Sequence, residues 1–404
     1  MTARVAITGI GIVNSLGNSV AEVLPKLRSG ASGVEIVPEY QEMKFRSALA
    51  GTIKNFEPPE IPREFKRQMG FNSILSSAAT LEALADAKLD ESLIRTPRTG
   101  IIVGNSGTYQ ETYQLVYEKH VRQKKLTGFA LPRSMASTIS ANLSVFLKTQ
   151  GHCFTVSSAC SGGASAICQS AQVIRLGLQD RIITGGVHLG SWEFDCLFDA
   201  LRVFSKREDN PPAASRPFDK DRDGLVPATA AGMLILENYD IARERGADIY
   251  GELIGFATNS DGDAMTTPSG EGSVRCMKLA LDDAGIAADE VEYINAHATG
   301  TKLGDGVEAQ GIAEVFGDRP YVSSTKSMTG HEVSAAGATE LIYTLLMMKH
   351  GFLAPTINLD NVDEDCAMIR HIPNQALEAS PRVAMSNSFG FGGVNAVIIV
   401  RKPE

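Results

Sequence analysis

Two stretches of the chain repeat one order: a strand, a turn of small residues, then a helix. The first is Thr155-Val-Ser-Ser-Ala-Cys-Ser-Gly-Gly-Ala-Ser-Ala-Ile167, and the second is Tyr321-Val-Ser-Ser-Thr-Lys-Ser-Met-Thr-Gly-His-Glu-Val-Ser-Ala-Ala-Gly337. A fainter pair, 101–108 and 293–301, follows the same order. This repetition predicts two similar α/β halves that meet near residue 250, with their turns converging at the junction. Chance recurrence of small-residue turns remains an alternative.

Strands and helices alternate along the chain, which favours a layered α/β fold. Two segments, 105–150 and 189–230, do not fit the repeat, and we interpret them as functional covers or interface elements. The predicted strands are 5–13, 100–103, 181–184, 232–236 and 395–400, and the predicted helices are 19–27, 73–87, 163–176, 273–284 and 335–349.

The composition limits the classes of function. Hydrophobic residues make up 43% of the chain, which is enough for a large core, and the net charge of −9 argues against a nucleic-acid partner. Six cysteines without a CxxC pair are typical of a reducing cytoplasm rather than of a disulfide scaffold. The most apolar stretch, 335–348, is interrupted by Glu340, so we expect no membrane span.

Cys160 is the candidate nucleophile. It lies between a strand and a helix, among Ser, Ala and Gly. Unpaired N–H groups at a helix N-terminus stabilise a thiolate, and small neighbours let a substrate come close. The alternative is an inert core cysteine, which is the common fate of a free thiol.

Two histidines occur at strand-to-helix turns of the second half. His297 follows the apolar strand 291–295, and His331 opens the helix of the second repeat. Cysteine with histidine is the usual pairing for covalent acyl chemistry, and two histidines suit the stabilisation of an enolate or oxyanion. Lys326 lies near His331, and Glu308 is a candidate ionic partner for it. Neither HExxH nor paired Cys/His spacing is present, so we expect no metal site.

A glycine-rich segment, Asn387-Ser-Phe-Gly-Phe-Gly-Gly393, precedes the last predicted strand. Such a hairpin can direct backbone N–H groups at an oxyanion, and Phe391 is placed to gate an acyl tunnel. A simple β-turn with core aromatics is the alternative.

Together these motifs resemble those of the elongating β-ketoacyl-acyl-carrier-protein synthases, condensing enzymes of the thiolase fold. The resemblance covers the whole chain. It implies a thiolase-like α/β fold in which two similar halves, 1–250 and 251–404, form a layered α-β-α-β-α core with loop and helix insertions. The motifs that carry it are Val156-Ser-Ser-Ala-Cys160, Arg216-Pro-Phe-Asp219, Arg222-Asp-Gly-Leu-Val226, His297-Ala-Thr-Gly-Thr301, Gly304-Asp-Gly-Val-Glu308, Ser324-Thr-Lys-Ser-Met-Thr-Gly-His331 and the glycine-rich segment.

The resemblance implies a decarboxylating Claisen condensation. An acyl group carried on Cys160 would join malonyl-acyl-carrier protein to give 3-oxoacyl-acyl-carrier protein, in fatty acid or related polyketide or polyene elongation. His297 and His331 would assist decarboxylation and stabilise the enolate, while Lys326 with Glu308 would order the site.

The resemblance also assigns supporting roles. Backbone N–H groups of Cys160 and Phe391 would form the oxyanion hole, and Phe391 with Phe389 would gate the site. Thr299 and Thr301 would bind the pantetheine arm. No cofactor is implied, because the substrates would be carried on the phosphopantetheine of the carrier protein.

Acyl-carrier protein is therefore the expected partner, and six basic residues would meet its acidic surface. A homodimer is implied, with residues 105–150 near the twofold axis, and a heterodimer with a related subunit stays open. The basic residues are Arg63, Lys66, Arg67, Arg122, Lys124 and Lys125.

Departures from the family pattern keep a specialised synthase open. Ala298 stands where the family usually has Gly, Val394 replaces a Thr, and Glu332-Val-Ser334 is unusual after the catalytic His. A thiolase would carry a second cysteine in the glycine-rich segment, and a starter-type synthase would carry Asn at position 331. A chain-length-factor-like partner subunit, which usually lacks the nucleophile, is the alternative from another class.

Overall fold

The computed structural model describes residues 2–403, and most of its strands join one eleven-stranded sheet in the order β11-β10-β9-β12-β13-β8-β1-β7-β6-β4-β5. Strands β2 and β3 pair separately. The strands are β1 (Val5–Val13), β2 (Val34–Ile36), β3 (Leu49–Gly51), β4 (Thr99–Asn105), β5 (Cys153–Val156), β6 (Arg181–His188), β7 (Ala230–Asn238), β8 (Gly251–Ser260), β9 (Tyr293–Asn295), β10 (Tyr321–Ser323), β11 (Arg370–His371), β12 (Val383–Gly390) and β13 (Val394–Arg401).

The large sheet consists of two blocks with the same internal order. The first block runs β5-β4-β6-β7-β1 and the second runs β10-β9-β12-β13-β8, with β11 added at the edge. In each block the strand that comes first in the chain, β1 or β8, lies next to the other block. The strand that comes third, β5 or β10, lies at the side farthest from it. The innermost strands pair through Ala6 with Glu252 and Ile7 with Gly251. Since β8 begins at Gly251, we propose residue 250 as the boundary between the halves.

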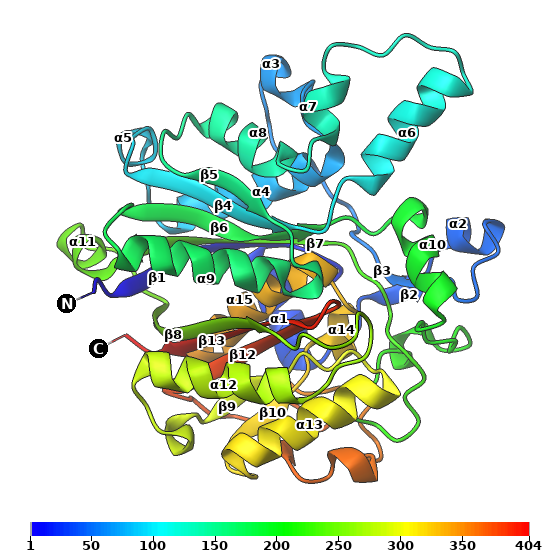
Figure 1. Ribbon diagram of the computed structural model, residues 1–404, viewed down its shortest axis with the longest axis vertical. Helices are drawn as coiled ribbons and strands as arrows, with labels where there is room; N and C mark the ends of the chain where they lie inside the picture. The colour runs from blue at the N-terminus through cyan, green and yellow to red at the C-terminus, as the bar shows by residue number, and fades with distance from the viewer. Residues whose placement is uncertain (1, 404) are drawn as a thin grey trace.

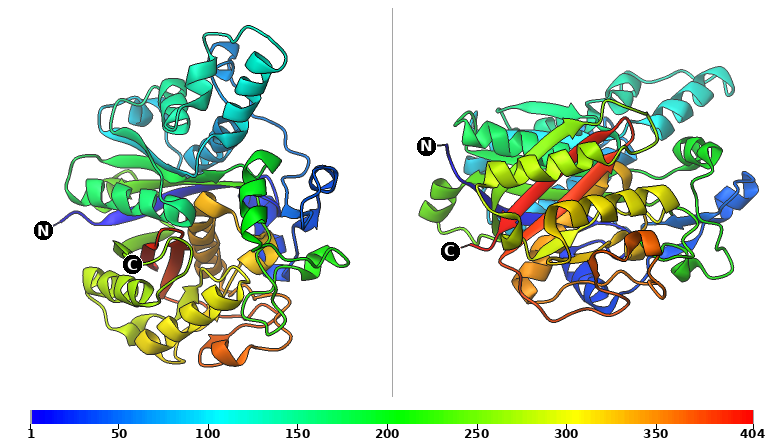
Figure 2. Two further views of the ribbon diagram at one scale, coloured as in Figure 1. Left: turned by 45° about the vertical axis from the view of Figure 1, so that its right-hand side comes forward. Right: turned by 60° about the horizontal axis from the view of Figure 1, so that its bottom comes forward.

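Helices separate and cover the two blocks, giving the α-β-α-β-α layers expected of a thiolase-like fold (Figures 1 and 2). Helices α4 and α8 cover the outer face of the first block, α9 and α15 lie between the blocks, and α12 and α13 cover the second block. The helices are α1 (Val20–Ser29), α2 (Pro38–Glu42), α3 (Arg63–Lys66), α4 (Phe71–Asp86), α5 (Glu91–Ile94), α6 (Tyr109–His120), α7 (Ala130–Ser134), α8 (Thr138–Leu147), α9 (Gly162–Arg175), α10 (Trp192–Leu201), α11 (Tyr239–Glu244), α12 (Glu271–Ala284), α13 (Lys302–Phe316), α14 (Lys326–Thr329) and α15 (Ala336–His350).

The elements expected from the sequence are present, with ends that differ by a few residues. The segments 105–150 and 189–230 are more helical than expected, because they contain α6, α7, α8 and α10. None of the helices within residues 2–403 combines the length and the apolar character that crossing a membrane requires.

The two central helices meet through small residues. A Cβ atom at Gly337 would lie 2.7 Å from the Ala164 Cβ, and one at Gly163 would lie 3.2 Å from the Ala338 nitrogen. These pairs are reciprocal, because Gly163 and Gly337 are each the second residue of their helix. Any larger side chain would push the helices apart, so this contact fixes how closely the halves approach.

Each central helix is preceded by a strained turn. Ala159 has φ of 47° and Val333 has φ of 43°, a left-handed conformation that is costly for a β-branched residue. Each residue begins a short 3₁₀ turn that leads directly into α9 or α15. This register makes Ser334 the counterpart of Cys160. Lys326 and His331, the reactive residues of the second repeat, lie earlier, in the longer segment between β10 and α15.

Candidate active site

The first half contributes a thiol, and the second half two imidazoles, to one cavity of about 310 Å³. Cys160 lies at the start of α9, His297 follows β9, and His331 follows α14. The cavity is also lined by Phe389, Phe391, Thr299, Thr301 and Glu308, so seven of the expected site residues join Cys160 around one space. Lys326 lies behind the lining, 2% exposed.

Backbone donors surround the Cys160 sulfur. The end of β12 lies against this turn, since a Cβ at Gly390 would be 3.1 Å from the Cys160 nitrogen. The backbone N–H groups of Phe391 and Cys160 face the sulfur and lower the thiol pKa, as does the Lys326 charge. Burial outweighs them and raises the pKa of Cys160 to about 11. The backbone N–H groups favour the thiolate, as expected for a helix start, but at neutral pH the thiol keeps its proton until the reaction removes it.

The two imidazoles are both neutral. Their ring centroids lie 5.3 Å apart with the planes nearly perpendicular. Burial, and then the positive charge of Lys326, lower the pKa of His297 and of His331 well below the ordinary value. A neutral imidazole carries one N–H donor and one acceptor nitrogen. The pair can therefore accept a proton from the thiol or donate hydrogen bonds to a developing oxyanion.

Lys326 pairs with Glu340 on α15, and this corrects the expected pairing with Glu308. Both partners are 2% exposed or less. Glu308 accepts hydrogen bonds from the backbone nitrogens of His297 at 2.8 Å and Ala298 at 2.7 Å. Asn387 donates to the same carboxylate at 3.2 Å. Glu308 thus positions the loop that carries His297, while Glu340 holds Lys326.

Three buried carboxyl groups surround the Lys326 charge. Burial raises the pKa of Glu308 and of Glu332 to about 7, and it also raises that of Glu340, against the lowering effect of Lys326. Glu332, the residue after His331, accepts hydrogen bonds from Asn14, Thr339 and Tyr343. Carboxyl groups that titrate near neutral pH therefore lie beside two imidazoles whose pKa values are well below that range.

Across residues 2–403, the His, Cys, Asp and Glu side chains form no group of three that could hold a metal ion.

Hydrogen bonds to its backbone fix the loop that carries Thr299 and Thr301. The two hydroxyl oxygens lie 3.3 Å apart, and both side chains line the cavity. Buried Asp305 accepts hydrogen bonds from the backbone nitrogens of Thr299 and Gly300, each at 3.1 Å. Arg222 donates to the carbonyl oxygen of Thr301 at 3.2 Å. These contacts fix the hydroxyls at the cavity wall.

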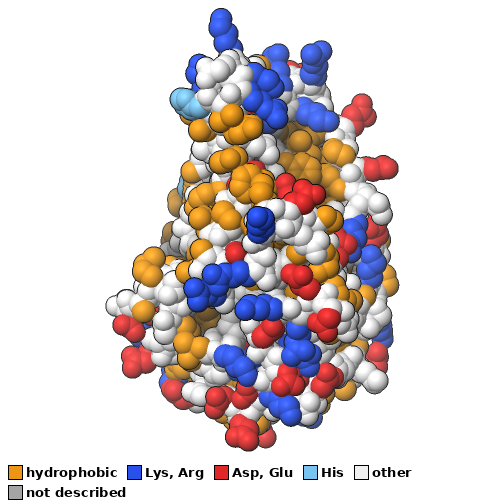
Figure 3. Space-filling model, turned by 90° about the vertical axis from the view of Figure 1, so that its right-hand side faces the viewer, with side chains coloured by type: hydrophobic (Ala, Val, Ile, Leu, Met, Phe, Trp, Pro, Cys, Tyr) orange, Lys and Arg blue, Asp and Glu red, His pale blue; other side chains and the backbone are white. Residues whose placement is uncertain are grey.

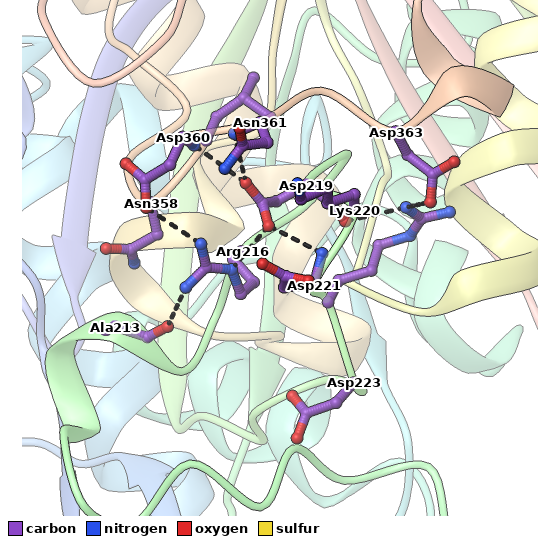
Figure 4. Close-up of polar contacts among 12 residues, drawn as sticks. Ala213, Arg216, Asp219, Lys220, Asp221, Asp223, Asn358, Asp360, Asn361 and Asp363 are labelled. Atoms are coloured by element: carbon purple, nitrogen blue, oxygen red, sulfur yellow. Dashed lines mark hydrogen bonds and ion pairs between the residues drawn. The ribbon is translucent and has the colours of Figure 1, made fainter.

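A second polar network supports the same region (Figure 4). Arg216 donates to Asp219 at 3.0 Å, and Asp219 also accepts from the backbone nitrogens of Asp360 and Asn361. Arg222 then joins Asp363, so two arginines tie the 213–223 loop to the 358–363 segment. The motif around Arg216 is therefore structural, and it anchors one wall of the site.

Aromatic side chains surround the thiol. The Phe389 ring lies 6.0 Å from His297, and the Phe391 ring lies 5.8 Å from Phe198 on α10. Phe198 in turn packs on Phe194, which belongs to the buried cluster around Cys160. Both predicted gate residues thus lie at the cavity.

The six expected basic residues gather at one end of the molecule, on α3 and directly after it, and in the loop after α6 (Figures 1 and 3). The two groups are linked, because the Arg67 guanidinium lies 4.5 Å from the ring of Phe129, which precedes α7. Arg122 and Lys124 both pair with Glu118, at exposed positions where such pairs contribute little stability.

Glu340, Asn387 and Phe198 were not among the site residues predicted from the sequence. Glu340 had a signal, because it is an acidic residue inside the most apolar stretch of the chain. Asn387 opens the glycine-rich segment but was not given a role. Nothing in the local sequence distinguished Phe198 from other phenylalanines.

We predict that the pH dependence of thiol labelling reports the raised pKa of Cys160. Its alkylation by iodoacetamide should accelerate about tenfold per pH unit from pH 7 to pH 9, because only the thiolate reacts and its fraction rises with pH below the pKa. Labelling is followed by peptide mass spectrometry, with the exposed Cys153 as an internal reference. A rate that is already constant below pH 8 would show a lowered pKa instead.

Comparisons with known proteins agree with this geometry. The family models for the N-terminal and C-terminal domains of beta-ketoacyl synthase match residues 2–242 and 250–360. The 3-oxoacyl-[acyl-carrier-protein] synthase 1 of Haemophilus influenzae is 42% identical over 99% of both chains. A beta-ketoacyl synthase from Burkholderia phymatum superposes with a TM-score of 0.95 at 37% identity, covering both chains fully. The ishigamide ketosynthase/chain length factor does so with a TM-score of 0.92 at 31% identity, also covering both chains fully. The chain belongs to the β-ketoacyl synthase family of condensing enzymes.

Proposed function

We propose that this protein catalyses the decarboxylating condensation of an acyl group with malonyl-acyl-carrier protein, giving 3-oxoacyl-acyl-carrier protein in fatty acid or related polyketide or polyene elongation. The observation that carries the proposal is the single cavity shared by Cys160, His297 and His331. The name of the Haemophilus influenzae relative supports the substrate class.

The first step is acyl transfer. The Cys160 sulfur attacks the thioester carbonyl of the acyl-carrier protein as a neutral imidazole accepts the thiol proton. The oxyanion forms between the backbone N–H groups of Cys160 and Phe391, which already face the sulfur. When the tetrahedral intermediate collapses, the bond to the pantetheine sulfur breaks and that sulfur takes the proton. Acyl-Cys160 remains.

The second step is decarboxylation and attack. The bond between the malonyl carboxylate and its methylene carbon breaks, CO₂ leaves, and the electron pair forms a thioester enolate. One N–H from each neutral imidazole stabilises the enolate oxygen. The enolate carbon attacks the carbonyl carbon of acyl-Cys160, the carbon–sulfur bond breaks, and 3-oxoacyl-acyl-carrier protein forms. The departing Cys160 thiolate takes a proton from solvent, directly or through an imidazole, which restores the resting thiol. Because decarboxylation generates the carbanion, the proposed reaction needs no metal or organic cofactor, and both substrates are carried on phosphopantetheine.

The intact site favours a catalytic chain over a chain-length-factor-like partner subunit. We propose a homodimer, supported by two features of the first half. Strand β5 is the last strand of the sheet and carries an exposed Phe154. Helix α6 presents the exposed Tyr109, Tyr113 and Val116.

We assign the protein to the cytoplasm, because its six cysteines are free, as is usual in that reducing compartment.

Replacing the nucleophile should separate the two half-reactions. Cys160→Ala should abolish acyl-enzyme formation and condensation, because the attacking sulfur is lost. Cys160→Gln should also block condensation while leaving malonyl decarboxylation, because His297 and His331 are untouched. Intact-mass analysis measures acyl loading, and release of labelled CO₂ measures decarboxylation.

Replacement of the exposed Cys153 by Ala serves as the matched control and should retain both activities. Acyl loading that persists in Cys160→Ala would refute the assignment of the nucleophile. A folded Cys160→Gln protein without decarboxylation would refute the separate role of the histidines.

The basic surface should control recognition of the carrier protein. Arg63 and Lys66 lie on α3. Each of the substitutions Arg63→Glu and Lys66→Glu should raise KM for acyl-carrier-protein substrates about fivefold, equivalent to about 1 kcal/mol, with little change in kcat. The increase should shrink at high salt. Arg319→Glu, an exposed site beyond α13 at the opposite end, is the control. An equal effect of all three reversals would argue against a docking surface on α3.

A further inference from the structure

A second, smaller cavity contains a buried histidine with an unused nitrogen. His188 ends β6 and is 2% exposed. Its Nδ1 is 2.8 Å from the Ser106 hydroxyl oxygen, while its buried Nε2 has no hydrogen-bond partner within residues 2–403. Burial lowers the pKa of His188 to about 3, so the ring is neutral. A buried polar atom without a partner costs free energy, so the Nε2 atom calls for a ligand or an ordered water.

This cavity lies at the same sheet edge as the nucleophile. Strands β4, β5 and β6 are parallel, and Ser106, the Cys160 turn and His188 all lie at their carboxyl ends. Ligands of α/β sheets bind at these ends. The cavity holds about 20 Å³ and is lined by His188, Ser106, Thr108 and Phe194 among others. That space suits one group the size of a water molecule or a hydroxyl.

Phe194 separates this cavity from the thiol. Its side chain lines the cavity and belongs to the same buried cluster as Cys160 and Val333. Its ring centroid is 4.9 Å from that of His188 and 5.1 Å from that of Tyr109. An acyl chain that extends from Cys160 along Phe194 would place its distal end beside His188.

Resting on the proposed function, we propose that this cavity receives the distal end of the acyl group on Cys160 and that His188 hydrogen-bonds an oxygen there, which gives the enzyme a preference for acyl chains that end in a hydroxyl. A hydroxyl both donates and accepts, so it satisfies Nε2 in either tautomer of the ring. A methyl group of the same size leaves Nε2 unpaired, and sites built around a polar group discriminate strongly against such analogues.

A charged chain end does not fit this chemistry. The neutral His188 supplies no positive charge, and the one guanidinium that lines the cavity, Arg133, is already paired with Glu111. Burying a carboxylate without a free cation is costly. The recognised group is therefore uncharged.

The test compares pairs of acyl-carrier proteins whose acyl chains have equal length and end in either methyl or hydroxyl, over a range of lengths. Formation of acyl-Cys160 is followed by intact mass, and kcat/KM is obtained for each chain. At one chain length, kcat/KM for the hydroxyl-ended chain should exceed that for the methyl-ended chain about tenfold or more. His188→Leu should remove that preference, and His188→Gln, which keeps a hydrogen-bonding group, should restore part of it.

His371→Leu is the matched control. His371 also has one paired nitrogen, Nε2 with the Cys366 carbonyl oxygen at 2.8 Å, and one buried nitrogen without a partner. It lies at β11, outside both cavities. Its replacement should leave the chain-end preference unchanged, so a general effect of losing a buried imidazole is separated from a local one.

The possible outcomes are distinct. If the unaltered enzyme loads methyl and hydroxyl chains equally at every length, the inference is overturned and the cavity holds a resident water. A preference that survives in His188→Leu also overturns it. If no acyl chain loads on Cys160, the proposed function itself fails. Should His188→Leu not fold, Ser106→Ala, which frees the Nδ1 atom, should still weaken the preference.

Discussion

The structure depends on one close contact, the crossing of α9 and α15 between the two half-sheets. Gly163 packs against Ala338, and Gly337 packs against Ala164, with no room for a Cβ on either glycine without displacement of its neighbours. The turns before these helices are equally constrained, since Ala159 and Val333 both adopt left-handed conformations. The contact brings a thiol from one half to imidazoles from the other. Backbone packing, rather than side-chain attraction, thus assembles the site.

Burial then sets the charge states in that site. It keeps the Cys160 thiol protonated and both imidazoles neutral, while Lys326 and Glu340 form a buried pair. A permanently charged imidazolium could not accept the thiol proton, and neutral rings can serve both half-reactions. The positive charge of Lys326 contributes to this neutrality by lowering the pKa of His297 and His331. The Lys326 charge thus acts on both imidazoles although its side chain does not line the cavity.

Sequence reasoning predicted the repeat, the layers and the residues that share the cavity, because strand–turn–helix units and reactive turns leave local patterns. Two features that depend on how closely the halves pack, the pKa of Cys160 and the partner of Lys326, could not be predicted from local patterns. The backbone N–H groups that favour a thiolate at Cys160 could be expected from the helix start, whereas the burial that raises the thiol pKa depends on contacts such as the one with β12. The partner of Lys326 was misassigned because Glu340 is brought close only by the direction of α15. His188 gave no signal, since a histidine at the end of a strand is ordinary until its burial is known.

The most direct measurement is a crystal structure of acyl-Cys160 enzyme with a malonyl thioester analogue that cannot lose CO₂. We expect one nitrogen each of His297 and His331 to lie within hydrogen-bond distance of the analogue's thioester oxygen. The analogue's methylene carbon should face the acyl carbonyl carbon at about 3 to 3.5 Å. A thioester oxygen bound by other groups, or an analogue held away from acyl-Cys160, would contradict the proposed mechanism.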